Sequence, residues 1–212
     1  MPEIAVLVYD RITALDAIGP YEVLQRWPDA RLRWVAPEPG VVKTDEGKLA
    51  IVADAALDDV TRPDVVLVPG GFGADDLLED ERVLSWLRRV HETSRWTTSV
   101  CTGSLLLGAA GILKGLRATT HWAQLERLAD FGAEPTAERV VFQGKVVTAA
   151  GVSSGIDMAL ALTAREYGDE LAQALQLGIE YDPQPPFDAG SPQKAPAAIV
   201  ELVRKRLEAT RA

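Results

Sequence analysis

The strongest constraint on the fold is the alternation of short, continuously apolar runs with segments of helical periodicity. Residues 4–9 read Ile-Ala-Val-Leu-Val-Tyr, and residues 63–69 read Pro-Asp-Val-Val-Leu-Val-Pro. Apolar runs without polar alternation are typical of strands covered on both faces, as in parallel sheets. Because helical patterns follow such runs, the sequence predicts βαβ units. We therefore expect an α/β fold with a mainly parallel sheet and helices on both faces.

The other expected elements follow the same alternation of strand and helix. Further strands are predicted at residues 31–36, 49–53, 96–100, 140–142 and 146–149. Helices are predicted at residues 14–25, 81–92, 102–113, 121–131, 154–167, 170–177 and 196–211.

The length of 212 residues fits one domain, residues 1–212. The composition changes near the end of the chain, where five of the 13 prolines fall within residues 183–196. Prolines at this density exclude a helix. We expect an extended, packed arm over residues 182–196, followed by a C-terminal helix.

Charge and rare residue types exclude several classes of function. Lys and Arg number 22 against 31 Asp and Glu, which gives a net charge of −9 and argues against nucleic acid as a partner. One Cys and two His leave no intramolecular disulfide and little for a metal site, so we expect neither metal nor cofactor. The sequence has no basic signal-peptide start and no apolar stretch long enough to span a membrane, so we expect no membrane partner and a cytoplasmic location.

The single cysteine, Cys101, falls between a predicted strand and a predicted helix. A nucleophile at such a turn stands clear of the backbone, and the following helix N-terminus favours a thiolate. We expect these surroundings to lower the pKa of the thiol. A buried, inert cysteine at a strand end is the alternative interpretation.

Two other features lie after predicted strands. Gly70 and Gly71 follow the strand at 63–69, and their N–H groups can approach a ligand or a developing negative charge, although a plain tight turn would look the same. Asp16 follows the first strand in an apolar setting. It is either a carboxyl in the first turn of a helix or a proton donor and acceptor that faces the thiol.

The two histidines differ in their surroundings. His91 stands in the charged stretch Arg88-Arg89-Val90-His91-Glu92, which is typical of a solvated helix surface. His121 begins a predicted helix after an extended segment. It either lines a cleft at the strand ends or is a structural residue.

Taken together, Asp16, Pro69-Gly70-Gly71, the turn at Cys101 and Ala118-Thr119-Thr120-His121 resemble the ThiJ/PfpI superfamily over nearly the whole chain. That superfamily is related in fold to the class I glutamine amidotransferases. The resemblance implies a flavodoxin-like sandwich and a homodimer. It also implies that Cys101 is the nucleophile, that Asp16 hydrogen-bonds its sulfur, and that the N–H groups of Gly71 and Thr102 form an oxyanion pocket.

Two departures narrow the expected activity. Many members have His directly after the nucleophile, whereas this chain has Thr102, which argues against a Cys-His-acid peptidase triad. The deglycase-like branch has Glu where this chain has Asp16. Asp16, Cys101-Thr102-Gly103 and the segment at 179–188 resemble the isonitrile-hydrating branch instead.

The resemblance therefore implies a small-molecule isonitrile substrate and a formamide product. Cys101 would attack the isonitrile carbon, and Asp16 would deliver a proton and later accept one from water. Thr102 would position water or the intermediate, and Asp182 would approach the pocket from the arm.

Other functions fit the same residues. One is a glyoxalase or deglycase acting on α-oxoaldehydes through Cys101, with help from His121. Another is a sensor in which Cys101 is oxidised without turnover. The arm also resembles the ligand domains of AraC-type regulators, but this chain is too short for their DNA-binding helices.

Overall fold

A computed structural model describes residues 1–211, which form two compact units that divide after Ile179. The first unit contains a seven-stranded sheet in the order β10-β11-β7-β6-β1-β2-β5. All neighbours in it are parallel except the β10–β11 pair. The strands are β1 (Glu3–Leu7), β2 (Arg31–Ala36), β5 (Ala55–Ala56), β6 (Val65–Val68), β7 (Trp96–Val100), β10 (Val140–Gln143) and β11 (Val146–Ala149).

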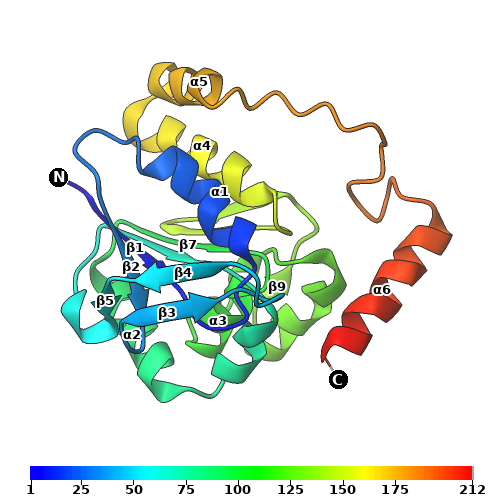
Figure 1. Cartoon of the computed structure of the whole chain (residues 1–212), viewed down its shortest axis with the longest axis horizontal. Coiled ribbons are helices and arrows are strands. Elements are labelled where there is room, and N and C mark those ends of the chain that lie inside the picture. The colour runs from blue at the N-terminus through cyan, green and yellow to red at the C-terminus, as the bar shows by residue number, and fades with distance from the viewer. Residues whose placement is uncertain (212) are drawn as a thin grey trace. The chain divides into compact units, whose positions relative to one another are not determined.

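Helices cover both faces of this sheet. On one side lie α1 (Ala14–Leu24), α4 (Ser154–Tyr167) and α5 (Asp169–Gly178), and on the other lie α2 (Glu81–Thr93) and α3 (Gly103–Ala109) (Figure 1). The expected α/β sandwich is therefore confirmed. No helix among residues 1–211 is both long enough and apolar enough to cross a membrane.

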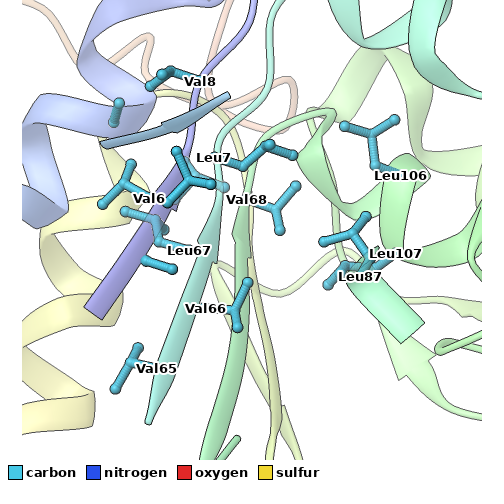
Figure 2. Packing of buried hydrophobic residues seen from close by; sticks show 14 of the residues in the cluster. Val6, Leu7, Val8, Val65, Val66, Leu67, Val68, Leu87, Leu106 and Leu107 are labelled. Carbon is cyan, nitrogen blue, oxygen red and sulfur yellow. The ribbon is translucent and has the colours of Figure 1, made fainter. Parts of the chain in front are cut away.

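The core explains why the central strands lack polar alternation. Successive side chains of a strand point to opposite faces, and both faces of β6 are covered. Figure 2 shows Val65 and Leu67 on one side of β6 and Val66 and Val68 on the other, where Leu106 of α3 also lies. All four β6 side chains are at most 1% exposed.

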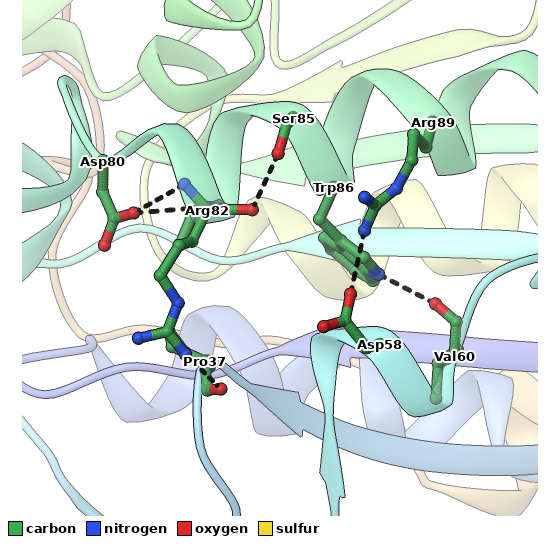
Figure 3. Close-up of polar contacts among 9 residues, drawn as sticks. Pro37, Asp58, Val60, Asp80, Arg82, Ser85, Trp86 and Arg89 are labelled. Carbon is green, nitrogen blue, oxygen red and sulfur yellow. Dashed lines mark hydrogen bonds and ion pairs between the residues drawn. The ribbon is translucent and has the colours of Figure 1, made fainter.

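Helix α2 shows how the sequence sets a helix boundary (Figure 3). Asp80 caps its start, because one carboxylate oxygen accepts the N–H of Arg82 at 2.8 Å. Trp86 is fully buried on the inner face, and its indole N–H donates to the Val60 carbonyl at 2.8 Å. The periodic apolar face and the cap together account for the prediction of this helix.

Several local predictions differ from the structure. A hairpin of β3 (Gly40–Lys43) and β4 (Ala50–Ala53) replaces the single expected strand, and a short pair joins β8 (Arg117–Ala118) to β9 (Glu134–Pro135). The helix expected over 121–131 is a run of 3-10 turns, η3 (Trp122–Phe131), and shorter ones, η1 (Leu57–Asp59) and η2 (Phe72–Leu77), were not predicted. In short segments, apolar spacing does not separate three from 3.6 residues per turn. Helix α3 also ends four residues early.

The second unit begins at Glu180 and contains α6 (Ala197–Arg211). The proline-bearing stretch before α6 forms no α-helix, as its composition predicts. A single domain with a packed arm stays a prediction.

Replacement of Gly103 by Ala is expected to destabilise the first unit by about 3 kcal/mol. A Cβ at this position would lie 2.0 Å from the Val68 carbonyl oxygen, so α3 and the end of β6 would have to separate. Gly178→Ala is the matched control, since a Cβ there has no neighbour within 4 Å among the described residues. Chemical denaturation measures both variants, and equal stability would contradict this close approach.

Candidate active site

The candidate site lies where the carboxyl ends of three neighbouring strands meet. Strands β1, β6 and β7 are adjacent and parallel, and the chain moves from β1 to β2 on one side and to β6 on the other. Such a switch point leaves a crevice at the strand ends in open α/β sheets. Tyr9, Gly70 and Cys101 follow these three strands, so the sheet brings their loops to one edge.

Cys101 occupies a strained turn directly after β7. Its φ of 57° is left-handed, which a residue with a side chain rarely adopts. Hydrogen bonds hold this conformation: the Cys101 carbonyl accepts the hydroxyls of Thr120 at 2.8 Å and Ser104 at 3.1 Å. The Cys101 N–H donates to the Ala149 carbonyl at 3.0 Å. The expected strand-to-helix turn is present, and Cys101 is 5% exposed.

Asp16 is fully buried in the first turn of α1. Its Oδ2 accepts the N–H of Gly70 at 3.0 Å. The carboxyl and the Cys101 thiol influence each other's pKa as a hydrogen-bonding pair. Oδ1, however, receives no aligned hydrogen bond from any described residue, although it is buried. A buried carboxyl beside a thiol can exchange a proton with a bound molecule through the oxygen that accepts no aligned hydrogen bond from the described residues.

Burial sets the electrostatics of this pair. It raises the pKa of Asp16 to about 7, against the opposing effects of the Cys101 thiol and the Gly70 N–H, and the charge of Asp45 adds to the rise. Burial also raises the pKa of Cys101, and the Asp16 charge raises it further, while the N–H groups of Thr102 and Val152 oppose both. The expectation of a lowered thiol pKa was therefore wrong, because loss of solvent outweighs the helix N-terminus.

Gly70, Gly71 and Thr102 form a closely packed loop beside the pair. The Gly71 N–H donates to Thr102 Oγ1 at 2.9 Å, and the same hydroxyl donates to the Gly71 carbonyl at 3.1 Å. A Cβ on Gly70 would lie 2.5 Å from the Thr102 nitrogen, so only glycine fits there. The N–H groups assigned to an oxyanion pocket thus face the Thr102 hydroxyl and the Cys101 thiol in this state. Their catalytic role stays a prediction.

The remaining predicted site residues, His121 and Asp182, belong to different compact units. His121 borders the loop that follows β11: a Cβ on Gly151 would be 2.9 Å from its ring, and Val152, the next residue, directs its N–H at the thiol. The Nδ1 of His121 accepts the Ala123 N–H at 3.3 Å. Asp182 belongs to the second unit, where it accepts a hydrogen bond from the Gln184 amide at 3.1 Å. Its approach to the pocket stays a prediction.

Sequence reasoning missed three contributors to this site. Thr120 holds the Cys101 carbonyl, and its place directly before His121 in the matching motif was the available signal. Val152 contributes a backbone N–H, for which no side chain gives a signal. Tyr9 looked like the end of a buried strand, but its hydroxyl donates to the Pro69 carbonyl at 2.7 Å. Within residues 1–211, no three His, Cys, Asp or Glu side chains are grouped to hold a metal ion.

Comparison with known proteins relates this geometry to a family. Residues 2–165 match the DJ-1/PfpI family. The chain is 44% identical over 204 residues to isonitrile hydratase of Pseudomonas putida, which covers 96% of this chain and 89% of that protein. It is 28% identical over 162 residues to the HTH-type transcriptional regulator CdhR of Pseudomonas aeruginosa, covering 74% of this chain and 48% of the regulator.

A crystal structure of a ThiJ/PfpI family protein from Pseudomonas syringae is similar throughout. The TM-score is 0.92 at 39% identity, and the match covers 99% of this chain and 89% of that one. The family match and the shared fold lead to the same conclusion: the chain belongs to the DJ-1/PfpI family.

Proposed function

We propose that this chain is a lyase that hydrates isonitriles to N-substituted formamides. The observation that carries the proposal is the buried pair of Asp16 and Cys101, in which a carboxyl of pKa about 7 lies beside the only thiol. Isonitrile hydration needs a nucleophile and a proton at the same carbon, and this pair supplies both. The 44% identity to an isonitrile hydratase over nearly the whole chain supports the same substrate class.

The first step joins the thiol sulfur to the terminal carbon of the isonitrile. The pair starts with one proton, which lies on the Cys101 sulfur because the pKa of the thiol is raised well above that of the Asp16 carboxyl, so Asp16 starts as a carboxylate. Asp16 removes the thiol proton as the sulfur attacks the carbon, and it then delivers that proton to the same carbon. The product is a thioimidate, R–N=CH–S–Cys101, and Asp16 is now a carboxylate. Asp16 Oδ1, which is buried without an aligned donor in the described chain, is the oxygen assigned to this transfer.

The second step consumes water. The Asp16 carboxylate removes a proton from water while the oxygen adds to the thioimidate carbon, and that proton passes to nitrogen. When the C–S bond breaks, Asp16 takes the hydroxyl proton and passes it to the departing sulfur. The formamide R–NH–CHO is released, and the pair regains its starting charge. One water is consumed for each isonitrile, so atoms and charge balance.

The neighbouring groups have supporting roles in this proposal. The N–H groups of Thr102 and Val152 stabilise negative charge on the departing sulfur, as their effect on the thiol pKa indicates. The Thr102 hydroxyl fixes the loop at Gly71 and can turn toward the intermediate. His121 and Asp182 are proposed to bind the substrate side chain. A homodimer stays a prediction from the family resemblance, and a cytoplasmic location stays a prediction from the sequence.

The pH dependence of kcat/KM for isonitrile hydration should follow the ionisation of Asp16 and Cys101. Below a pH of about 7 both members are protonated, so kcat/KM is expected to fall about tenfold per pH unit on the acid side. Above a pH of about 7 the pair keeps one proton, which is lost only when the Cys101 thiol, whose pKa is raised, also ionises. A pH–rate profile of isonitrile hydration measures the rise. A flat profile between pH 5 and about 8 would remove Asp16 from the mechanism.

The direct test compares substrates on the wild-type chain. Cyclohexyl isocyanide should give N-cyclohexylformamide with turnover, whereas methylglyoxal should disappear no faster than in buffer. Loss of methylglyoxal without formamide formation would favour the glyoxalase or deglycase alternative. Peroxide titration followed by measurement of the intact protein mass tests the alternative in which Cys101 is a redox sensor. The raised pKa of Cys101 predicts slow oxidation, so ready sulfinate formation without turnover would overturn the proposal.

A further inference from the structure

The phenol of Tyr9 lies beside the candidate site without belonging to the proton-transfer pair. The residue is 5% exposed, and its hydroxyl donates to the Pro69 carbonyl at 2.7 Å. The charges of Asp16 and Cys101 both act on this phenol, which places it within their electrostatic reach. Buried tyrosines usually find a hydrogen-bond partner. The partner of Tyr9 belongs to the loop whose Gly70 N–H binds Asp16.

The two hydrogen bonds meet on one peptide group. The peptide that joins Pro69 to Gly70 carries the carbonyl that accepts the Tyr9 hydroxyl. Its N–H donates to Asp16 Oδ2 at 3.0 Å. A peptide group is conjugated, so a donor on its oxygen makes its N–H a stronger donor. Tyr9 and Asp16 thus lie at the two ends of one polarised unit.

We propose that Tyr9 is a positioning residue for Asp16: its hydroxyl, acting through the Pro69–Gly70 peptide group, holds and strengthens the N–H that stabilises the ionised carboxyl. This deepens the proposed function, because it identifies what sets the charge of the general acid. The action of Tyr9 on Asp16 does not depend on which substrate binds. It rests on two hydrogen bonds that share one peptide.

The other groups that face the pair act on the ionisation of Asp16 in both directions, and burial is the largest influence against it. Asp45 raises the pKa of the Asp16 carboxyl, whereas the Cys101 thiol and the Gly70 N–H lower it. Tyr9 itself faces Asp16, Cys101 and Asp75, and these charges and burial raise its own pKa well above the usual value. The phenol therefore stays protonated, and remains a donor, wherever Asp16 titrates.

The test reads the Asp16 carboxyl directly. Infrared spectra taken across a pH series follow the carbonyl stretch of the protonated acid, and its loss in Asp16→Asn assigns the band. The wild-type midpoint should lie near the pKa of about 7. In Tyr9→Phe the midpoint should rise by about half a pH unit, and the acid limb of kcat/KM should move with it. Tyr167→Phe is the control, because this tyrosine is 37% exposed and packs against Trp27.

A second variant keeps the proposal falsifiable if Tyr9→Phe does not fold. Replacing Tyr9 with 3-fluorotyrosine retains the ring and makes the phenol a stronger donor, so the midpoint should fall. If the Asp16 titration midpoint is unmoved in both variants, or shifts in the same direction in both, Tyr9 does not act on Asp16 through the Pro69–Gly70 peptide group. The titration needs no substrate. Absence of isonitrile turnover would therefore reject the proposed function while leaving the test of Tyr9 intact.

Discussion

Cys101→Ala is expected to lower kcat/KM for isonitrile hydration by at least about 10⁴-fold. The reason is chemical: the chain has one cysteine, and the proposed route forms a bond between its sulfur and the substrate carbon. The neighbouring hydroxyls of Thr102, Thr120 and Ser104 already bond to backbone carbonyls, so no described neighbour is poised to replace the thiol. Formamide release measured by chromatography gives the rate.

Controls separate lost chemistry from lost structure. Cys101→Ser keeps the shape and a polar atom at the turn, and should be as inactive as Cys101→Ala while unfolding at nearly the wild-type denaturant concentration. Asp16→Asn should lose about 10²–10⁴-fold, the usual contribution of a general acid. Because the two groups act as a unit, the double variant should be no slower than Cys101→Ala alone. Hydration within tenfold of wild type in Cys101→Ala would exclude a thioimidate.

The sequence predicted the sheet and the location of the site because both depend on patterns along the chain. The runs at 4–9 and 65–68 lack polar residues since both faces of their strands are covered, and parallel strands bring their ends to one edge. Asp16 was open to two interpretations, as a first-turn residue or a partner of the thiol. The structure places it in the first turn of α1, over the end of β6 and beside the thiol, while its role as proton donor and acceptor stays a prediction.

What the sequence did not predict depends on solvent exclusion and on backbone groups. The pKa of Cys101 was expected to fall because of the helix that follows it. Only the packed structure shows that the thiol is buried beside a second acid, which reverses the direction. The N–H of Val152 and the peptide clamped between Tyr9 and Asp16 have no side-chain signature. They come together through tertiary contacts between loops that are distant along the chain.

Asp16→Asn should also stabilise the protein at neutral and alkaline pH, while it removes activity. Burial raises the pKa of the folded carboxyl from 3.8 to about 7. Between these values the folded chain holds a proton that the unfolded chain has lost, so the free energy of unfolding decreases as pH rises. The full interval corresponds to about 4 kcal/mol as an order of magnitude. Below pH 3.8 both states are protonated and the contribution is fully present; above about 7 it has been lost.

Asparagine does not titrate, so this pH dependence should disappear from the variant. Relative to wild type, Asp16→Asn should gain stability steadily from about pH 4 to about pH 7.5, by up to about 4 kcal/mol. Urea denaturation at several pH values measures the slope, and Asp130→Asn, at an exposed position, is the control. A constant difference across the range would mean that Asp16 ionises as easily when folded as when unfolded. A gain confined to the pH range where hydration is active would show that the buried acid is kept at a cost in stability because the proton transfer requires it.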